Sequence, residues 1–437
     1  MKLIPLKQLV TISSGQGAPK NAADFSKTGT PFIRAGSLEK LLGGEPEESL
    51  ELINEKTAKK YRLKLFPKNS VIFAKSGMSA TKDRIYLLKK PAYIVNHLAV
   101  LIPFENVNPE FLLIALRKFK PSSLIKDFAY PSINQTEIGC HKIPIPETIM
   151  DQIRIATLLS RVEALIATRK DNLRLLDEFL KSTFLEMFGD PVRNEKGFEV
   201  RSLNEFYIDP KNGTKCGPFG SALKKNEYVK SGVPVWNMDN ISKNGRLQPD
   251  VSLWITDDKF EELEKYSTID GDVIISRAGT VGKMCVLKTD YPKSIISTNL
   301  IRVRFGKSLL PLYFVSLMTY CKGRVGKLRT GPDGTFTHMN TGILDKLHFP
   351  YPPLVLQKQF VPIVEKVESI KTLYQQNLNE LENLYGALSQ KAFKGELDLS
   401  RIPLEKVPEE TVFNTTTEPT PPDQFAESGR YAQIGSR

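Results

Sequence analysis

Residues 29–38 read GTPFIRAGSL, and residues 232–241 read GVPVWNMDNI. When Gly29 is aligned with Gly232, Pro31 falls on Pro234, a shift of 203. The same order returns at shifts of 202 to 206: VIFAKSG at 71–77 falls on VIISRAG at 273–279, Pro109 and Phe111 on Pro311 and Tyr313, Asn134 on Asn340, PIP at 144–146 on PYP at 350–352, and Asn172 on Asn377. Solenoid repeats have periods of roughly 20–50 residues, so this period is too long for one. The sequence predicts a duplicated domain, with two similar lobes related by a pseudo-two-fold axis.

The composition is that of a basic globular protein. The 437 residues are 41% hydrophobic and carry a formal net charge of +12, which favours nucleic acid or an anionic membrane as partner. A merely basic protein is the alternative from charge alone. No apolar run approaches the roughly 20 residues that span a bilayer, and the N-terminus lacks a signal-peptide core. Four separated cysteines without a CxxC pair indicate reduced thiols and a cytoplasmic location.

Each half begins with a segment of short apolar runs broken by turn residues. The runs 71–73, 99–102, 273–275 and 300–303 predict buried strands. The segments 109–119 and 311–320 predict short helices that start near a proline. Both segments are therefore expected to be mixed α/β (α+β) domains.

Each half then ends in a long heptad pattern, in which apolar residues alternate at steps of three and four. Arg169 interrupts the first pattern and Lys371 the second. Two such helices predict an antiparallel coiled-coil pair, and the alternative is that each packs on its own lobe. The predicted seam holds Leu159, Val162, Ile166, Leu173, Leu176 and Leu180 in the first helix, and Val364, Val367, Tyr374, Leu378, Leu381, Tyr385 and Leu388 in the second.

These patterns predict five segments. They are a first domain at 1–147, a central helix at 148–190, a second domain at 191–353, a C-terminal helix at 354–397 and a tail at 398–437. The tail is rich in Pro, Thr and Glu, so it is expected to be disordered.

The sequence contains little that indicates catalysis. Neither a complete phosphate loop nor a dinucleotide-binding glycine pattern is present, and the four histidines show no metal-ligand spacing. His97 lies in an apolar stretch, which predicts a buried histidine. His338 lies in a polar loop and is a weak candidate for a contact residue.

The run GPFGSALKKNEYVKSGVPVWNMDNI at 217–241 resembles the opening motif of a target recognition domain in the specificity subunits of type I restriction-modification enzymes. The run MFGDPVRNEKG at 187–197 resembles that family's exit from its central helix. PIP at 144–146 and PYPP at 350–353, leading into Gln152 or Gln359, resemble its joint between domain and helix. The resemblance covers about residues 1–397. The first copy has SSGQGAPK at 13–20 in place of the opening motif, so the two domains are expected to read different sequences.

The resemblance implies a non-catalytic DNA-recognition subunit. Each target recognition domain would read one half of a bipartite, asymmetric double-stranded DNA site, and the helices would set the spacing and dock two modification (methyltransferase) subunits. Those subunits would carry S-adenosylmethionine and methylate adenine, and restriction (translocase and nuclease) subunits would use ATP and Mg²⁺. No cofactor, no metal and no membrane is expected for this chain itself.

Cations and polar residues at equivalent loops are the candidates for DNA contact, because Lys and Arg bind phosphates and polar side chains read base edges. For each of them a surface charge or turn former is the alternative, and for Asn134 and Asn340 a helix cap is the alternative. The candidates are Lys75, Lys82, Arg84, Tyr130, Ser132, Asn134, Lys224, Lys225, Arg277, Lys283, Lys322, Arg324, Lys327, Arg329, Thr337, His338 and Asn340.

Two other functions remain open from the sequence. One is a coiled-coil scaffold or assembly protein that lacks sequence-specific DNA binding. The other is a chain that itself modifies or cleaves nucleic acid.

Overall fold

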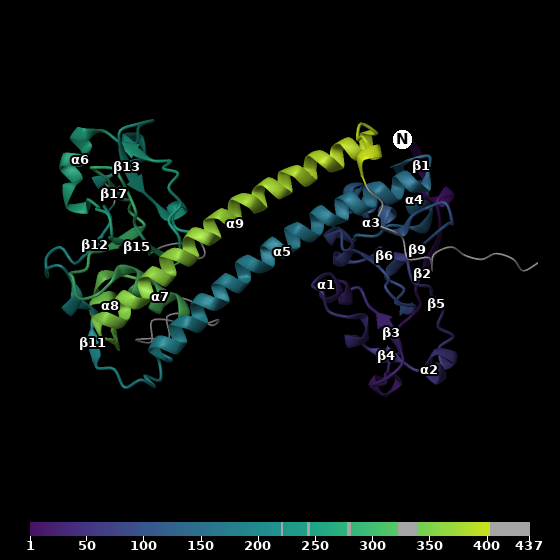
Figure 1. The fold of residues 1–437 in the computed structure, drawn as a ribbon, viewed down its shortest axis with the longest axis horizontal. Coiled ribbons are helices and arrows are strands. Elements are labelled where there is room, and N and C mark those ends of the chain that lie inside the picture. Colours follow the sequence, from purple (N-terminus) through teal and green to yellow (C-terminus); the bar gives the residue numbers. More distant parts are fainter. Residues whose placement is uncertain (220–221, 243–244, 278–280, 322–338, 403–437) are drawn as a thin grey trace, which may run out of the picture. The chain divides into compact units, whose positions relative to one another are not determined.

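The computed structural model describes residues 1–219, 222–242, 245–277, 281–321 and 339–402. Internal contacts divide the chain into two units (Figure 1). Unit 1 comprises Met1–Glu163 and Leu384–Arg437, and unit 2 comprises Ala164–Asn383. Each unit thus combines one globular part with a piece of each long helix. The predicted pseudo-two-fold axis concerns the mutual placement of the units and stays a prediction.

The globular part of unit 1 contains two four-stranded sheets and a short strand pair. The first sheet is antiparallel, in the order β2-β9-β6-β7, and the second has the order β4-β3-β8-β5 with β3 and β8 parallel. The strands are β2 Val10–Ser14, β9 Leu98–Pro103, β6 Val71–Ala74, β7 Ile85–Leu87, β4 Leu52–Ile53, β3 Thr30–Ile33, β8 Ala92–Ile94, β5 Leu65–Phe66, and the antiparallel pair β1 Lys2–Pro5 with β10 Lys142–Ile145.

Short helices cover these sheets. The helix α3 begins where Pro109 occupies its first turn, and Asn108 caps it by accepting a hydrogen bond from the Phe111 N–H at 2.9 Å. Its apolar face belongs to the same buried core as β6 and β9. The helices are α1 Ser37–Leu42, α2 Glu55–Lys60, α3 Pro109–Lys118 and α4 Gln135–Cys140.

Unit 2 repeats this plan, so the predicted duplication is confirmed. Its first sheet has the order β12-β18-β15-β16, and in its second sheet, β14-β13-β17, strands β13 and β17 are again parallel. The elements are β12 Thr214–Cys216, β18 Leu300–Val303, β15 Val273–Ser276, β16 Met284–Val286, β14 Trp254–Ile255, β13 Val233–Trp236, β17 Ile295–Ile296, the pair β11 Val200–Ser202 with β19 His348–Pro350, and helices α6 Asp257–Leu263, α7 Pro311–Tyr320 and α8 Thr341–Asp345. The four predicted strands and two predicted helices are all present.

The two globular parts share a close backbone approach at equivalent glycines. A Cβ on Gly15 would lie 2.0 Å from the Ile94 carbonyl oxygen, and a Cβ on Gly217 would lie 1.9 Å from the Ser297 carbonyl oxygen. Neither distance is compatible with any side chain. Glycine is therefore required at both positions for the chain to cross the second sheet.

The long helices α5 Ile149–Phe188 and α9 Leu354–Lys394 form the predicted antiparallel pair (Figure 1). In unit 2, the Arg169 guanidinium lies over the Tyr374 ring at 4.1 Å, and Lys170 pairs with Glu382 at 2.8 Å. In unit 1, the Tyr385 hydroxyl donates to Glu163 at 2.6 Å. Within unit 2, Lys170 pairs with Glu382, whereas Asp177, later in α5, pairs with Lys371, earlier in α9, so the two helices run antiparallel.

The predicted seam positions are all buried or half-buried, whereas most intervening residues are exposed. Both charged residues that interrupt the heptads have a partner on the other helix. Arg169 stacks on Tyr374, and Lys371, which is 2% exposed, bonds Asp177 of α5. A charge can be buried in such a seam only when it is paired.

Each long helix carries one buried glutamine that contacts its own globular part. Gln152 accepts a hydrogen bond from the Asn108 N–H at 2.8 Å, and Gln357 accepts one from the Leu310 N–H at 3.0 Å. The sequence alignment was wrong in pairing Gln152 with Gln359, because Gln359 is exposed and Gln357 makes the equivalent contact.

Among the helices that the structure describes, none combines the length and the apolar character that a membrane span needs.

Candidate nucleic-acid interface

Three segments of unit 1 meet at the end of β6. The Lys75 N–H donates to the His97 carbonyl at 2.9 Å, and the Lys75 carbonyl accepts from the Ile133 N–H at 2.8 Å. Ser76 forms a bridge with Ser132, and its hydroxyl lies 2.8 Å from His97 Nδ1. The candidates Lys75 and Ser132 are therefore brought together by the edge of a rigid sheet.

Large apolar side chains surround this edge and face solvent. Tyr130 is 83% exposed, Phe128 66% and Met78 65%. The Gly77 N–H donates to the Pro131 carbonyl at 2.8 Å, so Met78 and Tyr130 flank one backbone contact. Exposed apolar side chains beside a cation are typical of an interaction site, and aromatic rings can contact thymine methyl groups in the major groove.

Unit 2 repeats the first of these backbone contacts with different side chains. The Arg277 N–H donates to the Asn299 carbonyl at 2.9 Å, which matches the Lys75 contact with His97 at a shift of 202. The Arg277 guanidinium lies over the Phe219 ring at 4.7 Å, and Phe219 is 57% exposed. Phe219 corresponds to Gly17 in unit 1, so the two edges differ in chemistry at equivalent positions.

The structure assigns a local role to two candidates. Asn134 accepts from the Glu137 N–H at 2.8 Å as the N-cap of α4, and Asn340 accepts from the Ile343 N–H at 2.9 Å as the N-cap of α8. Capping accounts for the recurrence of both asparagines without any base contact.

The remaining described cations differ in solvent exposure and in ion pairing. Lys82 is exposed in the 3₁₀ helix η4 (Met78–Lys82), and Lys224 and Lys225 are exposed at the start of η8 (Lys225–Glu227). Arg84 pairs with Glu39 at 2.7 Å, and Lys283 is half-buried. The candidates Lys322, Arg324, Lys327, Arg329, Thr337 and His338 lie outside the described residues.

The prediction of a buried His97 is wrong. The residue is exposed, because it lies in the turn between β8 and β9 while its neighbours belong to central strands. The repeat carried the missing signal: position 299, which matches 97 at a shift of 202, is the polar residue Asn299. His97 and Asn299 thus join the candidate interface.

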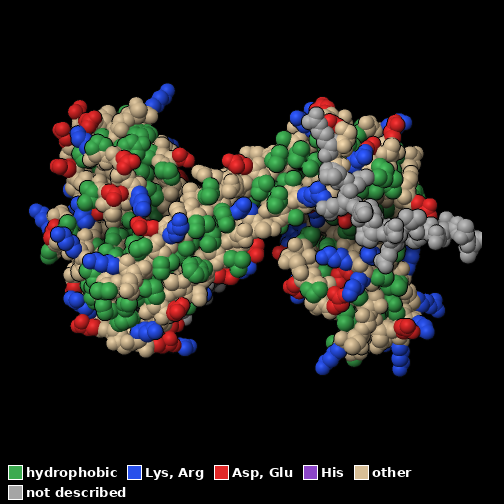
Figure 2. All heavy atoms as spheres, viewed as in Figure 1, with side chains coloured by type: hydrophobic (Ala, Val, Ile, Leu, Met, Phe, Trp, Pro, Cys, Tyr) green, Lys and Arg blue, Asp and Glu red, His purple; other side chains and the backbone are tan. Residues whose placement is uncertain are grey.

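Charges of both signs cover each unit. Figure 2 shows Lys and Arg side chains interspersed with Asp and Glu on the face in view. At the unit 1 edge, Lys126 pairs with Glu137 at 2.6 Å, and this carboxylate raises the pKa of Lys126. Cations and anions are thus interspersed on the face in view, so local geometry and not a single basic patch marks the candidate site.

Within the part of the chain that the structure describes, no three His, Cys, Asp or Glu side chains are grouped so that they could hold a metal ion. The four cysteines are not in disulfides, and Cys285 and Cys321 are buried.

Type I specificity subunits resemble this chain in sequence and in fold. The chain is 23% identical over 350 residues to the putative type I restriction enzyme MjaX specificity subunit of Methanocaldococcus jannaschii, covering 76% of this chain and 79% of that protein. It is also 23% identical over 367 residues to the MjaVIII specificity subunit of the same organism, covering 79% and 84%. The crystal structure of the type I restriction-modification S subunit from M. genitalium superposes with a TM-score of 0.57 at 14% identity, covering 90% of this chain and 96% of that one.

The family described as type I restriction modification DNA specificity domain matches the chain twice, at residues 1–176 and 195–383. These two matches coincide with the duplicated plan of the fold. Specificity subunits are non-catalytic, and the catalytic activities of these systems lie in other subunits. The chain therefore belongs to the family of type I restriction-modification specificity subunits, which recognise DNA.

Proposed function

We propose that each globular part reads one half of a bipartite, asymmetric double-stranded DNA site. The observation that carries this proposal is the pair of equivalent sheet edges. Lys75 and Arg277 have the same backbone contact, whereas their neighbours differ, with His97 and Gly17 in unit 1 but Asn299 and Phe219 in unit 2. One construction with two sets of side chains suits two different half-sites.

The contacts follow from the chemistry at each edge. Lys75 or Arg277 binds phosphate and supplies a salt-dependent affinity. In this proposal the polar groups His97 and Asn299 select bases, and the rings of Tyr130 and Phe219 make apolar contacts, for example with thymine methyl groups in the major groove.

The partner subunits are part of the same proposal. Helices α5 and α9 dock two modification subunits, which bring S-adenosylmethionine and direct methylation to adenine. Restriction subunits that use ATP and Mg²⁺ join the complex in the cytoplasm. Exposed apolar residues on the helices support the docking role, among them Leu165, Leu175 and Phe179 of α5 and Leu373 and Leu384 of α9.

Mapping of methyladenine in a host with and without this chain tests the function. We expect loss of one split motif that carries methyladenine in both parts. In hosts that carry a variant of the chain, Tyr130→Ala should change the base preference in one part of the motif only, and Phe219→Ala in the other part. A complex that methylates or binds without discriminating sequences at physiological salt would favour the scaffold instead. Methylation or nicking by the purified chain alone would favour an enzyme.

A further inference from the structure

Glu163 of α5 and Glu368 of α9 occupy equivalent positions, at the same shift of 205 that relates Gln152 to Gln357. In unit 1, Glu163 accepts from Arg117 of α3 at 2.7 Å and from the Tyr385 hydroxyl of α9 at 2.6 Å. One carboxylate thus joins both long helices to the globular part of unit 1.

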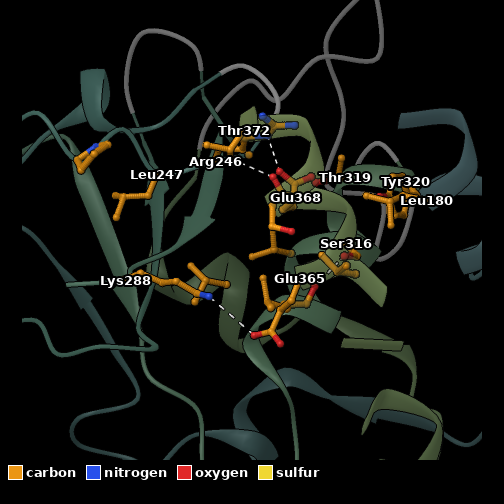
Figure 3. A pocket seen from close by; sticks show the side chains of 17 residues that line it. Leu180, Arg246, Leu247, Lys288, Ser316, Thr319, Tyr320, Glu365, Glu368 and Thr372 are labelled. Carbon is orange, nitrogen blue, oxygen red and sulfur yellow. Dashed lines mark hydrogen bonds and ion pairs between the residues drawn. The ribbon is translucent and has the colours of Figure 1, made fainter. Parts of the chain in front are cut away.

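Unit 2 lacks both of these partners. Thr319 stands at the position of Arg117, and Leu180 stands at the position of Tyr385. Thr319, Leu180 and Glu368 line a cavity of about 470 Å³, where smaller side chains have replaced the guanidinium and the phenol (Figure 3).

Glu368 is instead paired with a cation from the segment between η9 (Met238–Asn240) and β14 of unit 2. Arg246 lies 2.5 Å from the Glu368 carboxylate (Figure 3). Lys371 lies 2.9 Å from Glu368 and also bonds Asp177 of α5. The four charges form a chain from the globular part, through α9, to α5.

Two hydrogen bonds join Arg246 to Ser242 at its own end of this chain. The Ser242 N–H donates to the Arg246 carbonyl at 2.9 Å, the Arg246 N–H donates to the Ser242 hydroxyl at 2.9 Å, and Ile241 bridges Leu247. Asn240, which is 1% exposed, donates to the Gln248 carbonyl at 2.9 Å. This segment follows β13 and η9, so Arg246 is linked through a short stretch of chain to the second sheet.

The chain of charges is protected from solvent at its centre. Lys371 is 2% exposed, and burial raises the pKa of Glu368, an effect that Arg246 opposes. Burial likewise raises the pKa of Asp177, again against Arg246. A buried charge that loses its partner destabilises the protein strongly. The network therefore favours the one arrangement of helices and domain in which every charge is paired.

We propose that Arg246, Glu368, Lys371 and Asp177 are positioning residues that fix the pose of the second recognition domain on the helix pair, and so its reading of one half-site. Glu163, with Arg117 and Tyr385, does the same for the first domain through direct helix contacts. This inference rests on the proposed function that each domain reads one half.

The test uses the full chain in complex with its modification subunits. Methylation kcat/KM is measured on cognate DNA and on substrates with a single base changed in either half. The half affected by Tyr130→Ala defines the first half. Arg246→Met should lower discrimination in the second half about tenfold, a loss of about 1.4 kcal/mol, and leave the first half unchanged. Glu163→Gln is the matched control and should affect only the first half.

Two further variants keep the test decisive. Arg246→Lys retains the cation and should restore most of the discrimination. Glu368→Gln, which is nearly isosteric, carries the same expectation as Arg246→Met should that variant fail to fold. Equal change in both halves, or no change in either, would overturn the inference. If the complex with the unsubstituted chain does not discriminate between DNA sequences, the proposed function itself is overturned.

Discussion

Gln152 and Gln357 occupy equivalent positions in the two units. Each is buried in the first turns of its long helix. Its side-chain oxygen accepts a hydrogen bond from the backbone N–H of the residue just before a helix of the globular part. The distances are 2.8 Å to Asn108 N and 3.0 Å to Leu310 N. Both amides also donate to a backbone carbonyl, at Asn106 and Pro352 respectively, each at 3.0 Å. The joint between helix and domain is therefore made by polar contacts within a buried core.

Loss of this joint should destabilise the unit that contains it. Gln357→Leu leaves the Leu310 N–H without its acceptor in a buried place, which costs about 1–3 kcal/mol. Chemical denaturation followed by circular dichroism measures the loss. Gln359→Leu, on the exposed side of the same helix, is the matched control and should change stability by less than about 0.5 kcal/mol. Equal effects of the two variants would contradict the buried role of Gln357.

The glycine at the sheet crossing should tolerate no side chain. A Cβ at Gly15 would meet the Ile94 carbonyl at 2.0 Å, so Gly15→Ala must displace backbone. We expect a loss of more than about 2 kcal/mol, in the range of core overpacking. Gly17→Ala is the control, because no atom lies within 4 Å of its Cβ position. Thermal unfolding of both variants compares them, and a stable Gly15→Ala chain would refute the close approach.

The hydroxyl of Tyr385 should contribute to stability beyond the packing of its ring against the unit 1 core. Tyr385→Phe removes the 2.6 Å hydrogen bond to Glu163 and should cost about 1–2 kcal/mol. Tyr374→Phe, in the same helix, keeps the ring face on which Arg169 lies and should be nearly neutral. If Tyr374→Phe proves the more costly of the two in urea unfolding, the assigned role of Tyr385 is wrong.

Glu368 predicts a specific pH dependence. Burial raises its pKa above the ordinary 4.5, so the folded chain takes up this proton at a higher pH than the unfolded chain. Its contribution to the free energy of unfolding is therefore full below 4.5 and is lost as pH rises through the raised pKa. Relative to Glu368→Gln, the unsubstituted chain should gain stability as pH falls.

Glu205 supplies a control of opposite sign in the same unit. The Ser202 N–H, and then Arg201, lower the pKa of Glu205, so its contribution is present above its ordinary pKa and is lost as pH falls. Denaturant unfolding of Glu205→Gln and Glu368→Gln, from well below the ordinary pKa of 4.5 up to about pH 8, should show opposite trends relative to the unsubstituted chain. Parallel trends would contradict the raised pKa of Glu368.

Much of the fold could be predicted because its signals are local or periodic. The heptads predict α5 and α9, and the runs at 71–73 and 273–275 predict the central strands β6 and β15. The duplication adds a long-range signal, since equal order at equal spacing requires equal architecture. The candidate site was only partly predicted: Lys75 and Tyr130 lie at the exposed edge, whereas Arg84 is held by Glu39.

By itself, the sequence determined that this protein has two copies of one domain joined by an antiparallel helix pair, because hydrophobic periodicity and repeated order are properties of the chain. Only the tertiary structure decided that His97 is exposed, that Gln357 matches Gln152, and that Arg246 reaches Glu368. The physical reason is distance along the chain. Arg246 and Glu368 are far apart in sequence, and their contact depends on how the second sheet and α9 pack within unit 2.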